Sequence, residues 1–179
     1  GILLLLSMGG ALFFGAYSMS LGEVWASVVQ SHHEQGNFLL WHIRLPRILL
    51  AALTGAGLAV AGAAIQGLFR NPLADPSLIG VTSGAMLFAV LAIVLMGSLL
   101  ADAAAILQQA TVAIFAFAGG VVTTYFVYFL SRRQGKTYVM TMLLAGIAIS
   151  AFAAAITGVF IYLSDDQQLR AITFWSLGS

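Results

Sequence analysis

Residues 44–85 read RLPRILLAALTGAGLAVAGAAIQGLFRNPLADPSLIGVTSGA, and this stretch decides the fold. It begins with two arginines around Pro46, a residue suited to the first position of a helix because its missing N–H costs nothing there. A long apolar segment rich in Gly and Ala follows, up to Phe69. Pro72 and Pro76 then interrupt the pattern, because proline breaks the interior of a helix. The stretch predicts an apolar helix, a turn and the start of a second apolar helix.

The composition extends this pattern to the whole chain. Of its 179 residues, 61% are hydrophobic and only 7% are charged, and the mean hydropathy is +1.02. Soluble domains carry about 25% charged residues, so this chain cannot cover a water-facing surface. The sequence predicts an all-α polytopic integral membrane protein. The net charge of +1 gives no sign of nucleic-acid binding, and the lack of cysteine excludes disulfides and thiolate metal sites.

Five membrane spans are expected, since about 20 apolar residues cross a bilayer. Their ranges are about 2–18, 46–69, 77–100, 109–130 and 138–163, with a polar, outward-facing loop at 19–45. The short loop after the fourth span holds Arg132, Arg133 and Lys136, and the excess of basic residues in cytoplasmic loops places it inside, together with Arg70. Both ends fall within apolar or turn-like sequence, so we expect residues 1–179 to be part of a longer polypeptide.

Small residues recur at every fourth position on two of the spans. They are Gly55, Ala59, Ala63 and Gly67 on the second span, and Gly146, Ser150, Ala154 and Gly158 on the fifth. Helices in lipid associate partly through such small side chains, which let the backbones approach closely. Both faces are therefore predicted to be packing seams, with the lining of a pore as the alternative.

The chain carries no convincing chemical motif. Gly135-Lys136-Thr137 resembles the end of a phosphate-binding loop, but Leu130 stands where that loop needs a glycine, so no ATPase activity and no enzyme is expected. Beyond Arg47 at the very start of the second span, no Asp, Glu, Lys, Arg or His lies within the spans, which disfavours an ion-coupled secondary transporter. His32 and His33 are adjacent and would point in different directions, so they are interpreted as loop residues rather than metal or haem ligands.

Arg44 and Arg47 lie three residues apart, directly before the second span. One interpretation is interfacial anchoring, in which the side chains reach from the apolar region to water. The other is charge-assisted pairing with carboxylates of a partner protein, which the planar guanidinium group does well. The residues themselves leave both roles open.

Several segments together resemble the permease subunits of bacterial importers for iron chelates, haem and cobalamin, the FecCD type. These are Arg44-Leu45-Pro46-Arg47, the helix through Gln66, Asn71-Pro72-Leu73-Ala74-Asp75-Pro76, Leu78-Ile79-Gly80, Gly84-Ala85, Leu143-Leu144-Ala145-Gly146 and Phe174-Trp175-Ser176-Leu177-Gly178-Ser179. The resemblance covers nearly the whole chain, and the block from Arg44 to Ala85 is its most specific part.

The resemblance implies a ten-helix permease of the bacterial inner membrane, of which this chain is the N-terminal half. The permease forms a homodimer, works with cytoplasmic ATPase subunits and a periplasmic substrate-binding protein, and needs no cofactor or metal. Arg44 and Arg47 would meet acidic residues of the binding protein, and Val139 and Met140 would lie in the cytoplasmic gate region. The segment from Thr173 to Ser179 is most similar to haem permeases, with a ferric siderophore or cobalamin as the alternative substrate.

Overall fold

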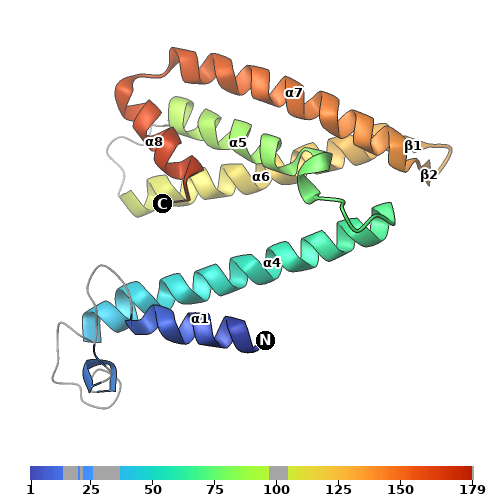
Figure 1. The fold of residues 1–179 in the computed structure, drawn as a ribbon. Helices are drawn as coiled ribbons and strands as arrows, with labels where there is room; N and C mark the ends of the chain where they lie inside the picture. The colour runs from blue at the N-terminus through green and yellow to red at the C-terminus, as the bar shows by residue number, and fades with distance from the viewer. Residues whose placement is uncertain (14–19, 21, 26–36, 97–104, 179) are drawn as a thin grey trace. The chain divides into compact units, whose positions relative to one another are not determined.

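The computed structural model describes residues 1–13, 20, 22–25, 37–96 and 105–178, and nearly all of them are helical. The helices are α1 (Ile2–Phe13), α4 (Leu45–Phe69), α5 (Val81–Leu91), α6 (Ala105–Ser131), α7 (Val139–Leu163) and α8 (Asp166–Ser176). Two π-helical turns, η1 (Leu39–Arg44) and η3 (Ala92–Met96), and one 3₁₀ turn, η2 (Pro76–Ile79), extend them. The chain divides into two units, residues 1–63 and residues 64–179, and each is described by itself (Figure 1).

Three helices of the described residues are long and apolar enough to cross a membrane. They cover Leu39–Phe69, Leu107–Ser131 and Val139–Leu163, and two shorter apolar helices cover Ile2–Phe13 and Val81–Leu95. In lipid the backbone must satisfy its own hydrogen bonds, and a continuous helix does so without help. The structure therefore confirms an all-α, multi-pass membrane protein.

Unit 1 contains α1, η1 and most of α4. The first span was expected at 2–18, and its described part is α1, which ends at Phe13; residues 14–18 lie outside the described residues. The prediction of a polar loop at 19–45 is wrong for residues 39–45, because η1 is helical there and runs directly into α4. The apolar run Leu39-Leu40-Trp41 extends the helical segment at this point, although His42 and Arg44 made it look polar.

A capped turn joins α4 to α5. Arg70 ends α4 in the left-handed conformation with a φ of 50°, and the Asn71 side chain then accepts a hydrogen bond from the Leu73 N–H at 2.9 Å. Asp75 accepts one from the Ser77 N–H at 2.7 Å, and its hydrogen bonds with the side chain and backbone of Ser77 lower the pKa of this carboxyl. The third span was expected to begin at 77, but a 3₁₀ turn occupies Pro76–Ile79 and α5 begins only at Val81.

The core of unit 2 forms around α5, which lies between α6 and α7 (Figure 1). Ala89 and Val90 of α5 are fully buried, as expected for the central helix of three. Ile79, Val127 and Met142 pack together at one end of this bundle, and Ile65 and Phe69 from the last turns of α4 cover them. At the other end, Gln168 of α8 donates a hydrogen bond to the Val94 carbonyl oxygen of η3. Unit 2 is thus a three-helix bundle with α8 across one end.

A short antiparallel hairpin connects α6 to α7. Strand β1 (Arg132–Arg133) pairs with β2 (Lys136–Thr137) around Gln134 and Gly135, both of which have positive φ. Two positive φ values in a two-residue loop are the geometry that matches the twist of a hairpin. Gly135 lies in the turn of this hairpin and Lys136-Thr137 form its second strand, whereas the matching residues of a phosphate-binding loop open a helix, so the partial likeness to such a loop is not matched by the local structure.

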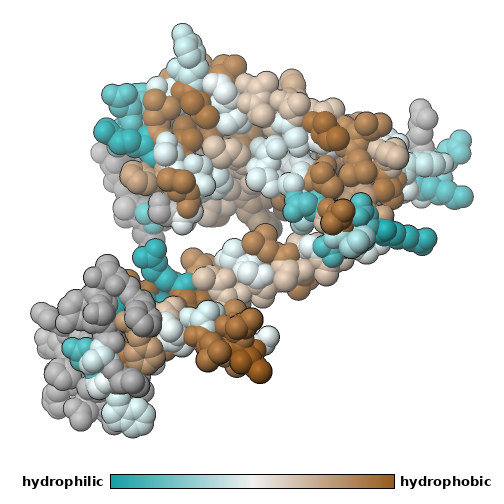
Figure 2. Space-filling view, in the orientation of Figure 1, coloured by the Kyte–Doolittle hydropathy of each residue, from teal (hydrophilic) through white to brown (hydrophobic). Residues whose placement is uncertain are grey.

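Hydrophilic residues gather at the two ends of the unit 2 bundle (Figure 2). Arg132 and Lys136 are exposed at the hairpin end, and Asp165, Asp166 and Arg170 are exposed at the α8 end. The surface between them is mostly apolar, with exposed Phe117, Phe126 and Phe152 among many others. This distribution is what a bundle that crosses a bilayer requires, since only its ends meet water.

Candidate functional site

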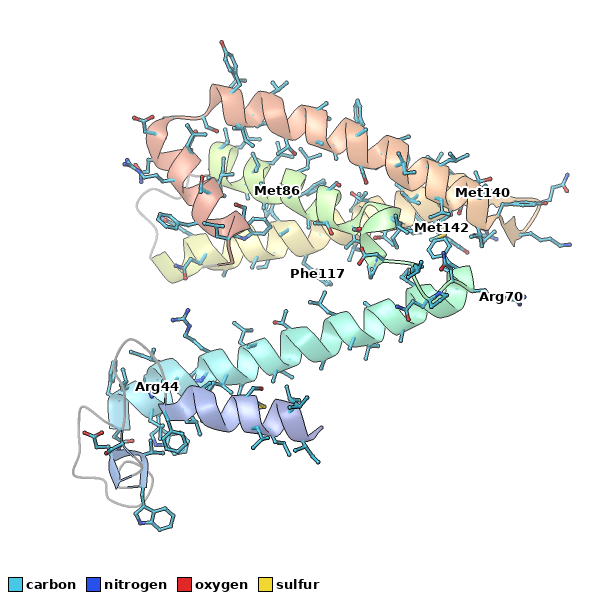
Figure 3. All side chains as sticks on the ribbon, viewed as in Figure 1. Arg44, Arg70, Met86, Phe117, Met140 and Met142 are labelled. Atoms are coloured by element: carbon cyan, nitrogen blue, oxygen red, sulfur yellow. The ribbon has the colours of Figure 1, made fainter. Side chains whose placement is uncertain are left out.

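Arg44 and Arg47, the predicted docking pair, lie in different environments. Arg44 is the last residue of η1 and is 8% exposed, and its Nη1 donates a hydrogen bond to the carbonyl oxygen of Leu12. Leu12 lies in the last turn of α1, where carbonyl groups have no partner within the helix and a cation is favoured. Arg47 is exposed. Arg44 therefore ties α4 to α1 within unit 1 (Figure 3), and Arg47 presents its charge to the surroundings.

Val139 and Met140, the predicted gate residues, form the start of α7. Tyr138 precedes them in an extended conformation without a side-chain capping bond. Val139 is 37% exposed and Met140 is 71% exposed, whereas Met142, two residues further, is buried in the core (Figure 3). The first turn of α7 thus has one face that packs on Ile79 and Val127 and one face that is open.

The two small-residue faces differ in what surrounds them. On α7, a Cβ added at Gly146 would overlap the Leu78 carbonyl oxygen of η2, and Ser150 lies close to Gly80. Further along the same face, Ala154 and Gly158 are exposed. On α4, all four residues are exposed, and an added Cβ at Gly55 or Gly67 meets no atom of the described residues within 4 Å.

A second close approach in the described residues lies between α5 and α6, where no seam was predicted. A Cβ at Gly84 would overlap the Thr123 side chain and lie 2.7 Å from the Gly119 carbonyl oxygen. A Cβ at Gly119 would lie 2.5 Å from the Gly84 carbonyl oxygen and 2.6 Å from the Phe88 side chain. The available signal was Gly80 and Gly84, four residues apart at the start of the third expected span, together with Gly119 in the fourth.

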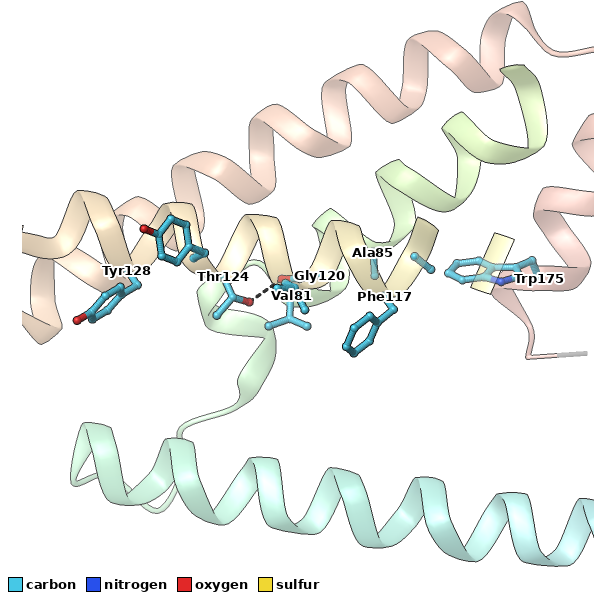
Figure 4. A pocket seen from close by; sticks show the side chains of 10 residues that line it. Val81, Ala85, Phe117, Gly120, Thr124, Tyr128 and Trp175 are labelled. Carbon is cyan, nitrogen blue, oxygen red and sulfur yellow. Dashed lines mark hydrogen bonds between the residues drawn. The ribbon is translucent and has the colours of Figure 1, made fainter. Parts of the chain in front are cut away.

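An open apolar groove of about 620 Å³ lies over α5, α6 and α8 (Figure 4). Its lining residues are Val81, Ala85, Ala116, Phe117, Gly120, Val121, Thr124, Tyr125, Tyr128 and Trp175. The Thr124 hydroxyl donates a 2.7 Å hydrogen bond to the Gly120 carbonyl oxygen, so its polar atom is satisfied within α6. Sequence analysis did not predict this groove, because its residues come from three separate segments.

The described residues contain no cluster of three or more His, Cys, Asp or Glu side chains that could hold a metal ion. His32 and His33 lie outside the described residues. His42 is described, and its ring stacks on Phe38 with 4.8 Å between the ring centroids. Nothing in the described part of the chain resembles a catalytic arrangement, and its apolar surfaces are suited to contacts within a membrane.

Comparison with known proteins gives the family. The model of the FecCD transport family matches residues 2–179. The chain belongs to the FecCD transport family. The family predicted from the residues is thus confirmed, and the match includes both the Arg44–Ala85 stretch and the bundle of unit 2.

Relatives of this FecCD chain include permease proteins for different substrates. It is 43% identical to the hemin transport system permease protein of Yersinia pestis, over 99% of this chain and 51% of that protein. It is 38% identical to the vitamin B12 import system permease protein of Serratia proteamaculans, over 98% and 50%. A solved inward-facing structure, described as a metal-chelate type ABC transporter, matches with a TM-score of 0.74 and 31% identity, over 97% and 50%. The chain spans about half the length of these proteins.

Within this FecCD chain, the structure brings together only some of the residues predicted for helix packing, docking and the gate. Gly146 lies against Leu78 of η2, and Ser150 lies close to Gly80, the residue between η2 and α5. Arg44 and Arg47 are neighbours in sequence with opposite exposure, and Val139 and Met140 are exposed side by side on α7. The α5–α6 contact and the apolar groove are additions that the sequence analysis missed.

Proposed function

We propose that this chain belongs to the transmembrane permease subunit of an ABC importer that carries haem, or another iron chelate, from a periplasmic binding protein into the cytoplasm. The observation that carries the proposal is the 43% identity to a hemin permease over 99% of the chain. In this proposal, residues 1–179 are the N-terminal half of a ten-helix permease that forms a homodimer in the bacterial inner membrane. Separate cytoplasmic subunits hydrolyse ATP.

The sequence of the long helices supports an importer that takes its energy from a separate ATPase subunit. Residues 48–69, 107–131 and 139–163 contain no Asp, Glu, Lys, Arg or His. Transporters that couple to protons or ions usually place such a group within the membrane, because it must bind the coupling ion there. A permease driven by a separate ATPase needs only to change shape, and apolar helices with small-residue contacts suit that role.

Docking of the binding protein is proposed at Arg44 and Arg47. Arg47 is exposed at the start of α4 and supplies the charge that pairs with a carboxylate of the binding protein. Arg44 supports the same segment through its hydrogen bond to the Leu12 carbonyl oxygen. At the other end of the permease, Val139 and Met140 are proposed to close the cytoplasmic end of the path, since both are apolar and exposed at the start of α7.

ATP hydrolysis by the reconstituted complex tests the function. The whole transporter is placed in proteoliposomes with its binding protein and is given hemin, a ferric siderophore or cobalamin. We expect hemin to stimulate hydrolysis most and to enter the vesicles only when ATP is present. Stimulation by cobalamin alone would favour the second candidate, which the likeness to vitamin B12 permeases supports. Uptake that runs on an ion gradient without ATP would overturn the proposal.

Two charge reversals test the docking segment separately. Arg47→Glu should weaken binding-protein affinity with little effect on thermal stability, because this side chain is exposed. Arg44→Glu should lower thermal stability as well, because it removes a buried contact with α1. Arg70→Glu, an exposed arginine at the end of α4, is the control and should leave docking unchanged. If Arg47→Glu docks normally, the proposed role of Arg47 is wrong.

A further inference from the structure

The apolar groove of unit 2 ends next to a basic hairpin. Along α6, the lining residues run in the order Phe117, Gly120, Thr124 and Tyr128, and Trp175 of α8 lies at the end away from Tyr128 (Figure 4). The floor contains small side chains, Ala85 of α5 and Gly120 of α6, so the groove is hollowed between the two helices. The groove is therefore a track along α6, with its Tyr128 end towards Arg132.

The part of the groove that lies along α6 corresponds in length to one leaflet of a bilayer. Phe117 and Tyr128 are eleven residues apart on α6, which is about 16 Å at the α-helical rise of about 1.5 Å per residue. The hydrocarbon core of a bilayer is about 30 Å thick, so one leaflet contributes about half of that. Phe117 also lies near the middle of α6, which runs from Ala105 to Ser131. This part of the groove therefore extends from near the centre of the membrane to one surface, and Trp175 of α8 lines the groove beyond Phe117.

Positive charge lies where the groove reaches that surface. The guanidinium carbon of Arg132 lies 5.6 Å from the centroid of the Tyr128 ring, over the ring face. Arg132 and Lys136 are both exposed, and the hairpin segment from Arg132 to Thr137 contains no acidic residue. A guanidinium group binds phosphate oxygens through two parallel hydrogen bonds. Basic pockets beside transmembrane helices are suited to anionic lipid headgroups.

We propose that the groove is a binding site for one anionic phospholipid. Its acyl chain lies along Phe117, Val121 and Tyr125 towards Trp175, and its headgroup phosphate meets Arg132 beside Tyr128. Lys136 adds attraction from the same hairpin. An anionic lipid is preferred to a zwitterionic one because the choline or ethanolamine group would bring a second positive charge to this end. The site would hold a lipid against α5 and α6, two helices that approach each other closely at Gly84 and Gly119.

Fluorescence of Trp175 tests the site, because this side chain lines the far end of the groove. The whole transporter, with Trp175 as its single tryptophan, is reconstituted in nanodiscs with a small fraction of phosphatidylglycerol or phosphatidylcholine that carries bromine near the chain ends. Each basic residue near a membrane surface strengthens attraction to anionic lipid by about fivefold. We expect brominated phosphatidylglycerol to quench Trp175 at lower mole fraction than brominated phosphatidylcholine, and Arg132→Ala to reduce this preference by about fivefold.

Two matched controls separate the site from a general surface effect. Arg70→Ala removes an exposed basic residue that does not lie in the hairpin, and it should keep the preference. Val121→Phe fills the groove, whereas its neighbour Val122 does not line the groove although the two valines are 52% and 53% exposed. In native mass spectrometry, Val121→Phe should lose the retained phosphatidylglycerol and Val122→Phe should keep it.

Three outcomes would overturn the proposal. Equal quenching by the two lipids would show that the headgroup is not selected. No quenching by either lipid would show that protein covers the groove, from another part of the permease or from a second copy. Retention of phosphatidylglycerol by Val121→Phe at the wild-type level would place the lipid elsewhere.

Discussion

The small-residue faces of α7 and α4 carry the same sequence pattern but meet different surroundings. On α7, Gly146 is buried against the Leu78 carbonyl oxygen, where a side chain cannot fit. On α4, Gly55 and Ala59 are exposed, and a Cβ added at Gly55 meets nothing within 4 Å. Small residues at every fourth position thus allow another segment to approach the helix closely, but they do not specify which segment it is. The partner of Gly146 is a backbone carbonyl of the 3₁₀ turn η2, which is not a helix with a matching face.

The largest loss of unfolding free energy is expected from a substitution at the α5–α6 contact. Gly84→Ala adds a Cβ that would overlap Thr123 and lie 2.7 Å from the Gly119 carbonyl oxygen, so two elements would have to separate. Overpacking typically costs about 1–3 kcal/mol, and a clash with backbone on a second helix places this variant at the upper end, about 3 kcal/mol. Thermal or denaturant unfolding of the purified permease measures the loss.

The control for this variant is Gly158→Ala, on the exposed part of α7, where an added Cβ meets nothing within 4 Å. It should be neutral or slightly stabilising, because Ala has the better helix propensity. Equal unfolding of Gly84→Ala and Gly158→Ala would show that α5 and α6 do not approach each other as closely as the structure has them.

A smaller loss of unfolding free energy is expected from Gly146→Ala. Its Cβ would overlap the Leu78 carbonyl oxygen and lie 3.0 Å from the Ile79 Cα, but both atoms belong to η2, a single turn that can shift, so we expect a cost of about 1–2 kcal/mol. Unfolding of Gly146→Ala beside Gly158→Ala compares two glycines of one predicted face. If both variants unfold like the wild type, the face of α7 is not a packing seam in either half.

The sequence alone predicted the class of fold and three long helices, because both follow from the hydropathy of long apolar segments. Residues 46–69, 109–130 and 138–163 were the expected ranges, and α4, α6 and α7 occupy Leu45–Phe69, Ala105–Ser131 and Val139–Leu163. Helix formation in lipid needs only a long apolar run, which is local information. The start of α5 was missed, because Gly80 has a φ of 80° and interrupts the helix that Pro76 begins.

The parts that sequence analysis missed depend on contacts between distant segments. Arg44 looked like half of an exposed pair, but the Leu12 carbonyl oxygen holds it in a buried position. Gly84 stands four residues after Gly80, but this spacing does not name a partner, and only the arrangement of α5 on α6 shows that Gly84 meets Gly119. The groove combines residues of α5, α6 and α8, and Trp175 was noted only for its family likeness. Spacing along one helix contains none of this information.

Substitutions on the exposed small-residue face of α4 should affect stability less than substitutions at the buried Gly146 of α7. Ala59 is exposed, so Ala59→Leu should change the unfolding free energy by less than about 0.5 kcal/mol. If this face is a packing seam of the whole permease, the same variant should lower dimer assembly and substrate uptake. Size-exclusion chromatography and vesicle uptake measure these two effects, and Leu58→Ala, at an exposed neighbouring position, is the control. Normal assembly and uptake by Ala59→Leu would rule out the seam at this position.

The smallest effect concerns Asp75, which caps the turn that brings Leu78 to Gly146. Its carboxylate accepts the Ser77 N–H, and the hydrogen bonds with Ser77 hold its pKa below the usual value of 3.8. A carboxyl whose pKa is lower in the folded state stabilises that state above the unfolded pKa, and this stabilisation is lost as the pH falls through the folded value. Asp75→Ala should therefore unfold at a slightly lower temperature than the wild type at pH 7, and the difference should shrink as the pH falls below 3.8. Asp75→Asn keeps an acceptor oxygen and should lose less at pH 7. A difference between Asp75→Ala and the wild type that is the same at every pH would show that the negative charge does not stabilise the turn against Gly146.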